Sequence, residues 1–134
     1  MIHLDTTFLV DLLRETKSRK TGAAILFLSS RESEELGISI FVQCELCAGA
    51  ELSTSPSQEL VKIQRLCDAL RVYYPDESFA PLYGRLLSGL ERSGQRISTM
   101  DLLIATSALS AGARLVTRNA RHFSRIPGLS IDTY

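Results

Sequence analysis

Three carboxylates lie where the sequence pattern predicts that a strand gives way to a helix or that a helix begins. Asp5 follows Ile2-His3-Leu4, Glu45 follows the apolar run 38–42, and Asp101 opens the apolar segment 102–111. If the strands are parallel, their carboxyl ends line one edge of the sheet, where ligands bind. Three acids meeting there would repel one another without a cation, and clustered oxygen ligands are those that Mg²⁺ or Mn²⁺ selects. The sequence therefore predicts a divalent-metal site.

Each acid also has a structural interpretation. Asp5 could cap the helix that follows it, and Glu45 could be a first-turn residue that the helix dipole favours. Asp101 stands three residues after Ser98, the spacing of a capping box. The neighbouring side chains favour the metal site, because hydroxyl and carboxamide groups accompany the acids at the predicted edge: Thr6, Thr7, Thr117 and Asn119.

Length and composition indicate one globular domain over residues 1–134. Of these residues, 45% are apolar and 22% are charged, which argues against disorder. No apolar run approaches the ~18 residues of a membrane span, and no basic leader precedes the first strand. The three cysteines (Cys44, Cys47 and Cys67) are an odd number, which favours reduced thiols and a cytoplasmic location. We interpret them as small buried residues, because no second pair exists to complete a zinc site.

The elements that must position the acids alternate along the chain. Apolar periodicity predicts strands at 1–4, 36–41, 71–74, 114–117 and, at an edge, 129–132. It predicts helices at 7–14, 20–31, 43–52, from Ser55 to about residue 70, 79–90 and 98–111. This alternation is typical of a three-layer α/β/α fold with a mostly parallel sheet of four or five strands. Within it, His3 is expected in the core and Asp76 at a helix cap.

The net charge is zero, yet arginines gather near the end of the chain. From Leu102 onward the only acid is Asp132, while Arg118, Arg121 and Arg125 recur at helical spacing. Such a stripe could contact RNA phosphates or could be a solvated helix face.

Four segments resemble the motifs of PIN-domain ribonucleases of the VapC toxin type. The first is Ile2 to Leu13 with Asp5, and the second is Ser39 to Ala50 with Glu45. The third runs from Gly94 to Ala105 with Asp101. The fourth is Leu115-Val116-Thr117-Arg118-Asn119 with His122-Phe123 and Pro127-Gly128-Leu129. The four motifs occur in the family's order over nearly the whole chain.

This resemblance implies a Mg²⁺- or Mn²⁺-dependent endoribonuclease that is the toxin of a toxin–antitoxin pair. It implies Asp5, Glu45 and Asp101 as the acidic cluster. Because Mg²⁺ typically takes only one or two direct carboxylates, we expect Asp5 and Asp101 as direct ligands and Glu45 to act through a metal-bound water or as proton acceptor. Thr6, Thr117 and Asn119 would orient the site. His122 occupies a position that commonly carries a fourth acid in the family, so a second metal would be held less tightly. The implied partners are RNA and a cognate antitoxin.

Two alternatives belong to other functional classes. A phospho-signalling receiver domain would need a paired acid after the first strand and a lysine near the last strand, but the lysines stand only at 17, 20 and 62. A PIN-like domain that binds RNA or a partner without cleaving it is favoured only by His122. The short apolar helices also predict a homodimer, with the helix 79–90 as one candidate surface.

Overall fold

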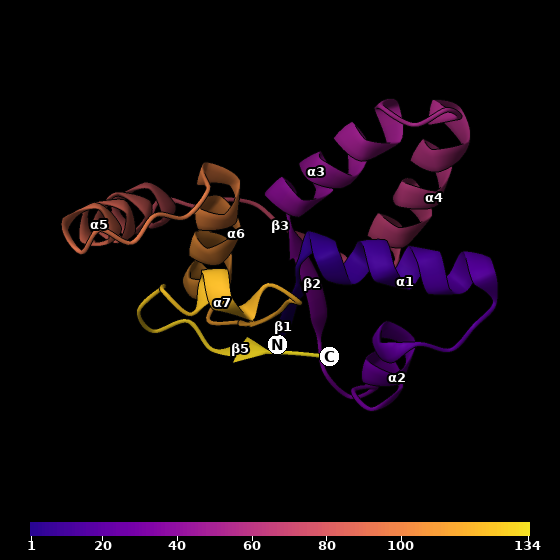
Figure 1. Ribbon diagram of the computed structural model, residues 1–134, viewed down its shortest axis with the longest axis horizontal. Coiled ribbons are helices and arrows are strands. Elements are labelled where there is room, and N and C mark those ends of the chain that lie inside the picture. The colour runs from indigo at the N-terminus through magenta and orange to yellow at the C-terminus, as the bar shows by residue number, and fades with distance from the viewer.

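Five parallel strands form one sheet in the computed structural model, which describes all residues 1–134 (Figure 1). The strands are β1 (Ile2–Leu4), β2 (Leu36–Ser39), β3 (Arg71–Tyr73), β4 (Arg114–Val116) and β5 (Ile131–Asp132). The helices are α1 (Thr6–Ser18), α2 (Ala23–Ser29), α3 (Ile40–Glu51), α4 (Pro56–Asp68), α5 (Phe79–Arg92), α6 (Thr99–Ser110) and α7 (Ala120–Phe123). The strand order is β3-β2-β1-β4-β5, and every pair is parallel, which confirms the predicted α/β/α class.

The chain reverses its direction across the sheet between β1 and β4. Strands β2 and β3 are added on one side of β1, and β4 and β5 are added on the other side. In doubly wound sheets such a reversal opens a crevice at the carboxyl ends of the two strands concerned, and ligands bind there. The residues that follow β1 and β4 are Asp5 and Thr117. The topology therefore places these two side chains at the expected ligand site.

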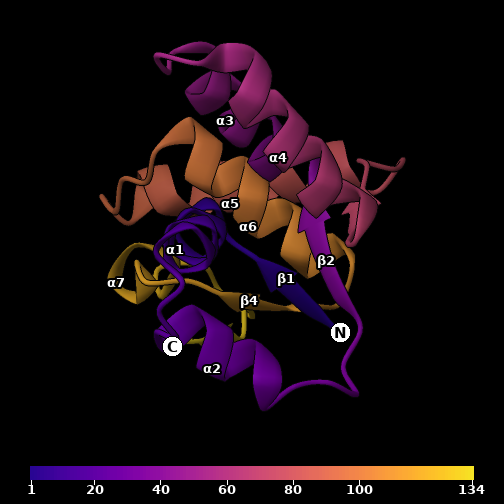
Figure 2. The same ribbon diagram turned by 90° about the vertical axis from the view of Figure 1, so that its right-hand side faces the viewer.

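Helices cover both faces of the sheet. Figure 2 shows α5 and α6 on one side of β1 and β4 and α2 on the other. Helix α6 ends at Ser110, shortly before β4 begins at Arg114, so α6 runs back across the sheet and its amino end lies at the carboxyl edge of the strands. This connection brings Asp101, in the first turn of α6, to the same edge as Asp5.

Aliphatic and aromatic side chains from both layers form one core. Ile2 and Leu4 on β1 and Leu115 on β4 are fully buried, as expected for central strands covered on both faces. Phe8 on α1 packs edge-on against Phe27 of α2 and Tyr134, with ring centroids 5.6 Å and 4.7 Å apart. This packing joins α1 and α2 to Tyr134, the second residue after β5.

Three expectations about local structure need correction or refinement. The strand predicted to reach Phe41 ends at Ser39, because the Ser39 hydroxyl accepts a hydrogen bond from the Val42 amide (3.2 Å) and begins α3. Of the cysteines expected to be buried, Cys67 is buried and Cys47 is partly buried, whereas Cys44 is exposed. Asp76 was expected at a helix cap, but the N-cap of α5 is Ser78; the Asp76 carboxylate instead accepts bonds from the Ser78 amide and hydroxyl in the turn before the helix. None of the helices combines the length and apolar character that crossing a membrane requires.

His3 is a core residue, as predicted, and its environment disfavours charge. The ring is 1% exposed, lies 4.6 Å from the Tyr73 ring between centroids, and its Nε2 has no hydrogen-bond partner. Burial is the main cause that lowers the pKa of His3 from 6.5 to about 4. The folded protein therefore holds the neutral imidazole through most of the acidic range.

We expect folding stability to fall as the pH drops from about 6.5 toward about 4, because the unfolded chain binds a proton at His3 before the folded chain does. A shift of this size is worth about 3 kcal/mol at its limit. Urea unfolding at pH 7 and pH 4.5 should show a smaller loss in His3→Leu than in the wild type. His122→Leu serves as the control, because that ring is exposed. An equal pH dependence in His3→Leu and the wild type would contradict this account.

Candidate metal and RNA site

Asp5 is a buried carboxylate held between two strands and two hydroxyls. It is 3% exposed, and its amide donates to the carbonyl of Val116 on β4 (3.0 Å). Its Oδ2 accepts hydrogen bonds from the hydroxyls of Thr7 (2.9 Å) and Thr117 (2.7 Å). Asp5 occupies the N-cap position of α1 but makes no side-chain capping bond, so the capping interpretation is wrong. Its Oδ1 receives no hydrogen bond from the protein and is free to bind a cation.

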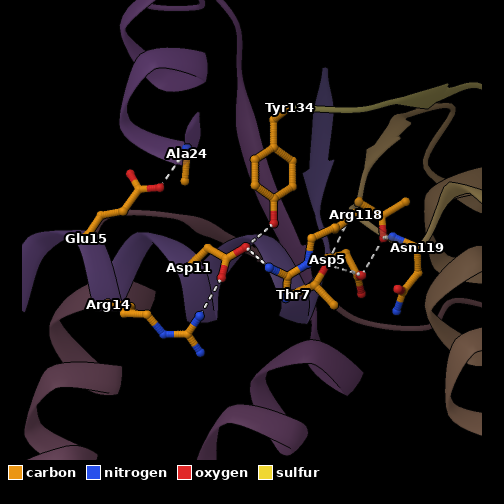
Figure 3. Close-up of polar contacts among 10 residues, drawn as sticks. Asp5, Thr7, Asp11, Arg14, Glu15, Ala24, Arg118, Asn119 and Tyr134 are labelled. Carbon is orange, nitrogen blue, oxygen red and sulfur yellow. Dashed lines mark hydrogen bonds and ion pairs between the residues drawn. The ribbon is translucent and has the colours of Figure 1, made fainter. Parts of the chain in front are cut away.

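The same two hydroxyls fix the segment that follows β4. Thr117 Oγ1 accepts the Asn119 amide (3.0 Å), and Thr7 Oγ1 accepts the Arg118 amide (3.3 Å). Each hydroxyl therefore donates to Asp5 and accepts from the segment 117–119 (Figure 3). The orientation of Asp5 and the path of this segment depend on one another.

Glu45 lies beside Asp5 through an intervening threonine. The Thr6 hydroxyl donates to Glu45 Oε2, which leaves Oε1 without a protein donor. Because α3 begins at Ile40, Glu45 belongs to the second turn, and the interpretation as a dipole-favoured first-turn residue is wrong. The register of α3 turns this carboxylate toward α1 and the carboxyl edge.

Asp101 forms a second group with His122. The Asp101 amide donates to Ser98 Oγ (3.1 Å), so Ser98 caps α6 as its spacing predicted. The Asp101 carboxylate lies 3.6 Å from Nδ1 of His122, whose side chain is 53% exposed. His122 thus faces both Asp101 and solvent.

The three acids share one edge of the sheet but do not form a closed ligand cluster. No three side chains among the histidines, cysteines, aspartates and glutamates lie close enough together to hold a metal ion between them. The donor chemistry nevertheless fits a hydrated Mg²⁺, which keeps several waters and takes one or two direct carboxylates. Asp5 Oδ1, Glu45 Oε1 and the Asp101 carboxylate are the oxygens that could hold it.

Asp11 is a buried acid near the site that the sequence analysis did not single out. Its Oδ2 accepts the Tyr134 hydroxyl (2.8 Å) and pairs with NH1 of Arg118 (2.8 Å), and its Oδ1 pairs with NH1 of Arg14 (3.3 Å). Burial, followed by the bond to Asp11, raises the pKa of Tyr134 to about 12, so the phenol stays protonated. Only the Asp11–Arg14 spacing was a signal in the sequence.

The arginines do not form a stripe along one helix. Helix α7 spans only Ala120–Phe123, so Arg121 lies within it and Arg118 and Arg125 lie outside. Arg118 pairs with Asp11, and Arg125 donates to the carbonyl of Arg96. Helical spacing failed as a guide because the short α7 is flanked by the turn after β4 and the turn at Ser124.

A groove between α1, α3 and α4 opens beside the acids. It has a volume of about 570 Å³, and Thr6 and Glu45 line it close to Asp5. Val10, Leu13, Leu46 and Ile63 give it apolar walls, and Arg14, Lys17, Glu59 and Lys62 contribute charges. The groove could therefore bind an amphipathic segment beside the carboxylates.

Comparison with known proteins agrees with this arrangement. The model of the PIN domain family matches residues 2–129. The chain belongs to the PIN domain family. It is 32% identical to Ribonuclease VapC1 of Haemophilus influenzae (strain R2866) over 126 residues, which cover 94% of this chain and 92% of that protein. It is 35% identical to the tRNA(fMet)-specific endonuclease VapC of Salmonella typhimurium over 97 residues, or 72% of this chain and 74% of that one.

Solved structures of similar proteins share the fold of this chain. VapBC2 from Rickettsia felis, solved bound to a DNA fragment from their promoter, superposes with a TM-score of 0.88 at 29% identity and covers 100% of this chain and 99% of that chain. The resemblance to VapC-type PIN domains, predicted from four motifs, is therefore confirmed.

We expect Thr117→Val to destabilise the protein by roughly 1–3 kcal/mol, because a buried carboxylate oxygen loses a donor. Thr106→Val is the matched control, since Thr106 is equally buried but its hydroxyl bonds only the Leu102 carbonyl of its own helix. The midpoint of urea unfolding at constant slope measures both losses. Equal losses of stability in the two variants would mean that the Thr117–Asp5 bond contributes no more than the bond of Thr106 to its own helix.

Proposed function

We propose that this PIN domain is a Mg²⁺- or Mn²⁺-dependent endoribonuclease that acts in the cytoplasm as the toxin of a toxin–antitoxin pair. The observation that carries the proposal is Asp5, a buried carboxylate with one free oxygen at the switch point of the sheet and Glu45 beside it. Its relatives include proteins named as a ribonuclease and a tRNA-specific endonuclease. The substrate class is single-stranded or loop RNA, and the products carry a 5′-phosphate and a 3′-hydroxyl.

The side chains divide the work of phosphodiester hydrolysis. A bound divalent cation shields phosphate oxygens and acidifies a water. Asp5 and Asp101 would hold the cation, and Thr7 and Thr117 keep Asp5 in one orientation. Glu45, held at Oε2 by Thr6, presents Oε1 to accept a proton from the attacking water. Asn119 and His122 contribute polar groups at the rim.

RNA phosphates would be bound by arginines beside the acids. Arg121 is exposed on α7 and has no acidic partner, so it offers a full charge to a phosphate. Arg125 lies beyond the end of α7 and donates to the carbonyl of Arg96, and Arg118 shares its charge with Asp11. Arg121 is therefore the leading contact of the three arginines predicted to bind RNA.

Asp5→Asn and Asp101→Asn should each reduce Mn²⁺-dependent cleavage of RNA by about 100-fold or more, because loss of groups that merely support metal ligands already costs about 10- to 100-fold. EDTA should abolish wild-type cleavage. Asp76→Asn is the matched control, since Asp76 follows β3 at the same edge but bonds only Ser78. Full activity in EDTA would reject metal dependence, and RNA binding without cleavage by the wild type would favour the binding-domain alternative.

The partner that fits the groove is an antitoxin with an amphipathic helix. Structures of VapBC complexes are among those similar to this chain. The apolar walls would bind the helix face, and a basic residue of the antitoxin would enter beside Glu45 and compete with the metal. Charge pairing would mainly set specificity and the association rate. The homodimer remains a prediction, with the half-exposed Leu87 on α5 at its candidate surface.

Val10→Asp should abolish neutralisation by the cognate antitoxin while leaving RNA cleavage intact, because it places a charge on the apolar wall of the groove. Val61→Asp is the control, since Val61 on α4 is also exposed but does not line the groove. Antitoxin binding is measured by calorimetry. Equal binding to Val10→Asp and the wild type would place the antitoxin elsewhere.

A further inference from the structure

We infer that Asp11 and Tyr134 are positioning residues for the candidate active site and act through Arg118 on the segment 117–119. The inference rests on the proposed function. It assigns Arg118 mainly to an internal anchor, because its guanidinium pairs with a carboxylate that is itself buried.

The first step is the geometry at Asp11. Figure 3 shows Asp11 on α1 with Arg14, Arg118 and Tyr134 gathered around it. Arg118 and Tyr134 both contact Oδ2 at 2.8 Å, and Arg14 contacts Oδ1. A buried carboxylate needs such partners, and removing one of them leaves a charge that water cannot fully solvate.

The second step connects Asp11 to Asp5. Arg118, whose guanidinium pairs with Asp11, also donates a hydrogen bond from its backbone amide to Thr7 Oγ1. The Thr7 hydroxyl in turn donates to Asp5 Oδ2. The next residue, Asn119, donates to Thr117 Oγ1, which donates to the same oxygen. Fixing Arg118 therefore fixes both hydroxyls that orient Asp5.

The third step is the place of Tyr134. Its ring packs against Phe8 on α1, and β5, which precedes it, pairs with β4. The Thr117 amide donates to the carbonyl of Asp132 (3.1 Å). Tyr134 thus holds the same oxygen of Asp11 that pairs with Arg118, while β5 holds the start of the segment 117–119.

The decisive variant is Tyr134→Phe, which keeps the ring against Phe8 and removes only the hydroxyl. We expect faster hydrogen exchange at the Arg118 and Asn119 amides, weaker Mn²⁺ binding measured by calorimetry without RNA, and kcat lowered by about tenfold with KM unchanged. Asp11→Asn should act in the same direction. Arg118→Lys, which retains a cation for Asp11, should lose less than Arg118→Ala.

The chain supplies a matched control at the opposite edge of the sheet. There Glu35 Oε1 accepts the Tyr73 hydroxyl (3.0 Å) and pairs with Arg71 (2.8 Å), which repeats the same three residue types away from the acids. Tyr73→Phe and Glu35→Gln should leave Mn²⁺ binding and kcat unchanged. If Tyr73→Phe lowered kcat as much as Tyr134→Phe, the effect would be a general loss of stability and the inference would fail.

Two further results would overturn the inference. Wild-type amide exchange and kcat in Tyr134→Phe would show that the hydroxyl positions nothing. If Arg118→Ala raised KM and altered the salt dependence of cleavage but left kcat unchanged, Arg118 would be an RNA contact instead. Failure of the proposed function looks different, since the wild type itself would then show no metal-dependent cleavage, and the exchange rates of the two amides would still test the positioning.

Discussion

The carboxylate of Asp5, buried between β1 and β4, is the constraint on which this end of the molecule depends. A carboxylate that is 3% exposed must be compensated locally, and here two threonine hydroxyls and the amino end of α1 provide the compensation. One hydroxyl comes from the first turn of α1, shortly after β1, and the other comes from the residue that follows β4. The reversal of strand order therefore creates the crevice and also supplies the groups that allow a charge to remain in it.

The acids are distributed so that each has a separate support. Asp5 has Thr7 and Thr117, Glu45 has Thr6, and Asp101 has His122 and the helix capped by Ser98. Because each carboxylate has different partners, the three do not gather into a close cluster, which limits their mutual repulsion. Because no three of these side chains lie close enough together to hold an ion, the donor set would suit a hydrated ion with one or two direct carboxylates better than an ion that needs every ligand in direct contact.

The strands and their parallel arrangement were predicted from the sequence, because apolar periodicity and strand–helix alternation are local signals. The sequence also predicted three acids meeting around a metal ion, whereas no three acidic, histidine or cysteine side chains lie close enough together to hold one. The start of α3 was predicted too late in the sequence. Ile40, Phe41 and Val42 continue the apolar run of β2, and only the Ser39 cap ends the strand. The Asp11 network was missed for a different reason. Tyr134 lies 123 positions from Asp11, and no local pattern connects them. Pairings of this kind arise only when β5 takes its place beside β4.

The two carboxylate–arginine–tyrosine groups show how burial decides what the same chemistry does. Glu35 keeps 51% of its side chain exposed, so water screens its pair with Arg71 and the contact contributes little beyond holding an edge. The Asp11 side chain is only 12% exposed, so water cannot replace its partners. Loss of a partner therefore leaves a carboxylate charge that is poorly solvated. The amide of Arg118 reaches Asp5 through a single threonine, which is why strict placement here has consequences for chemistry. A salt bridge at the other edge, however similar in composition, has no such path.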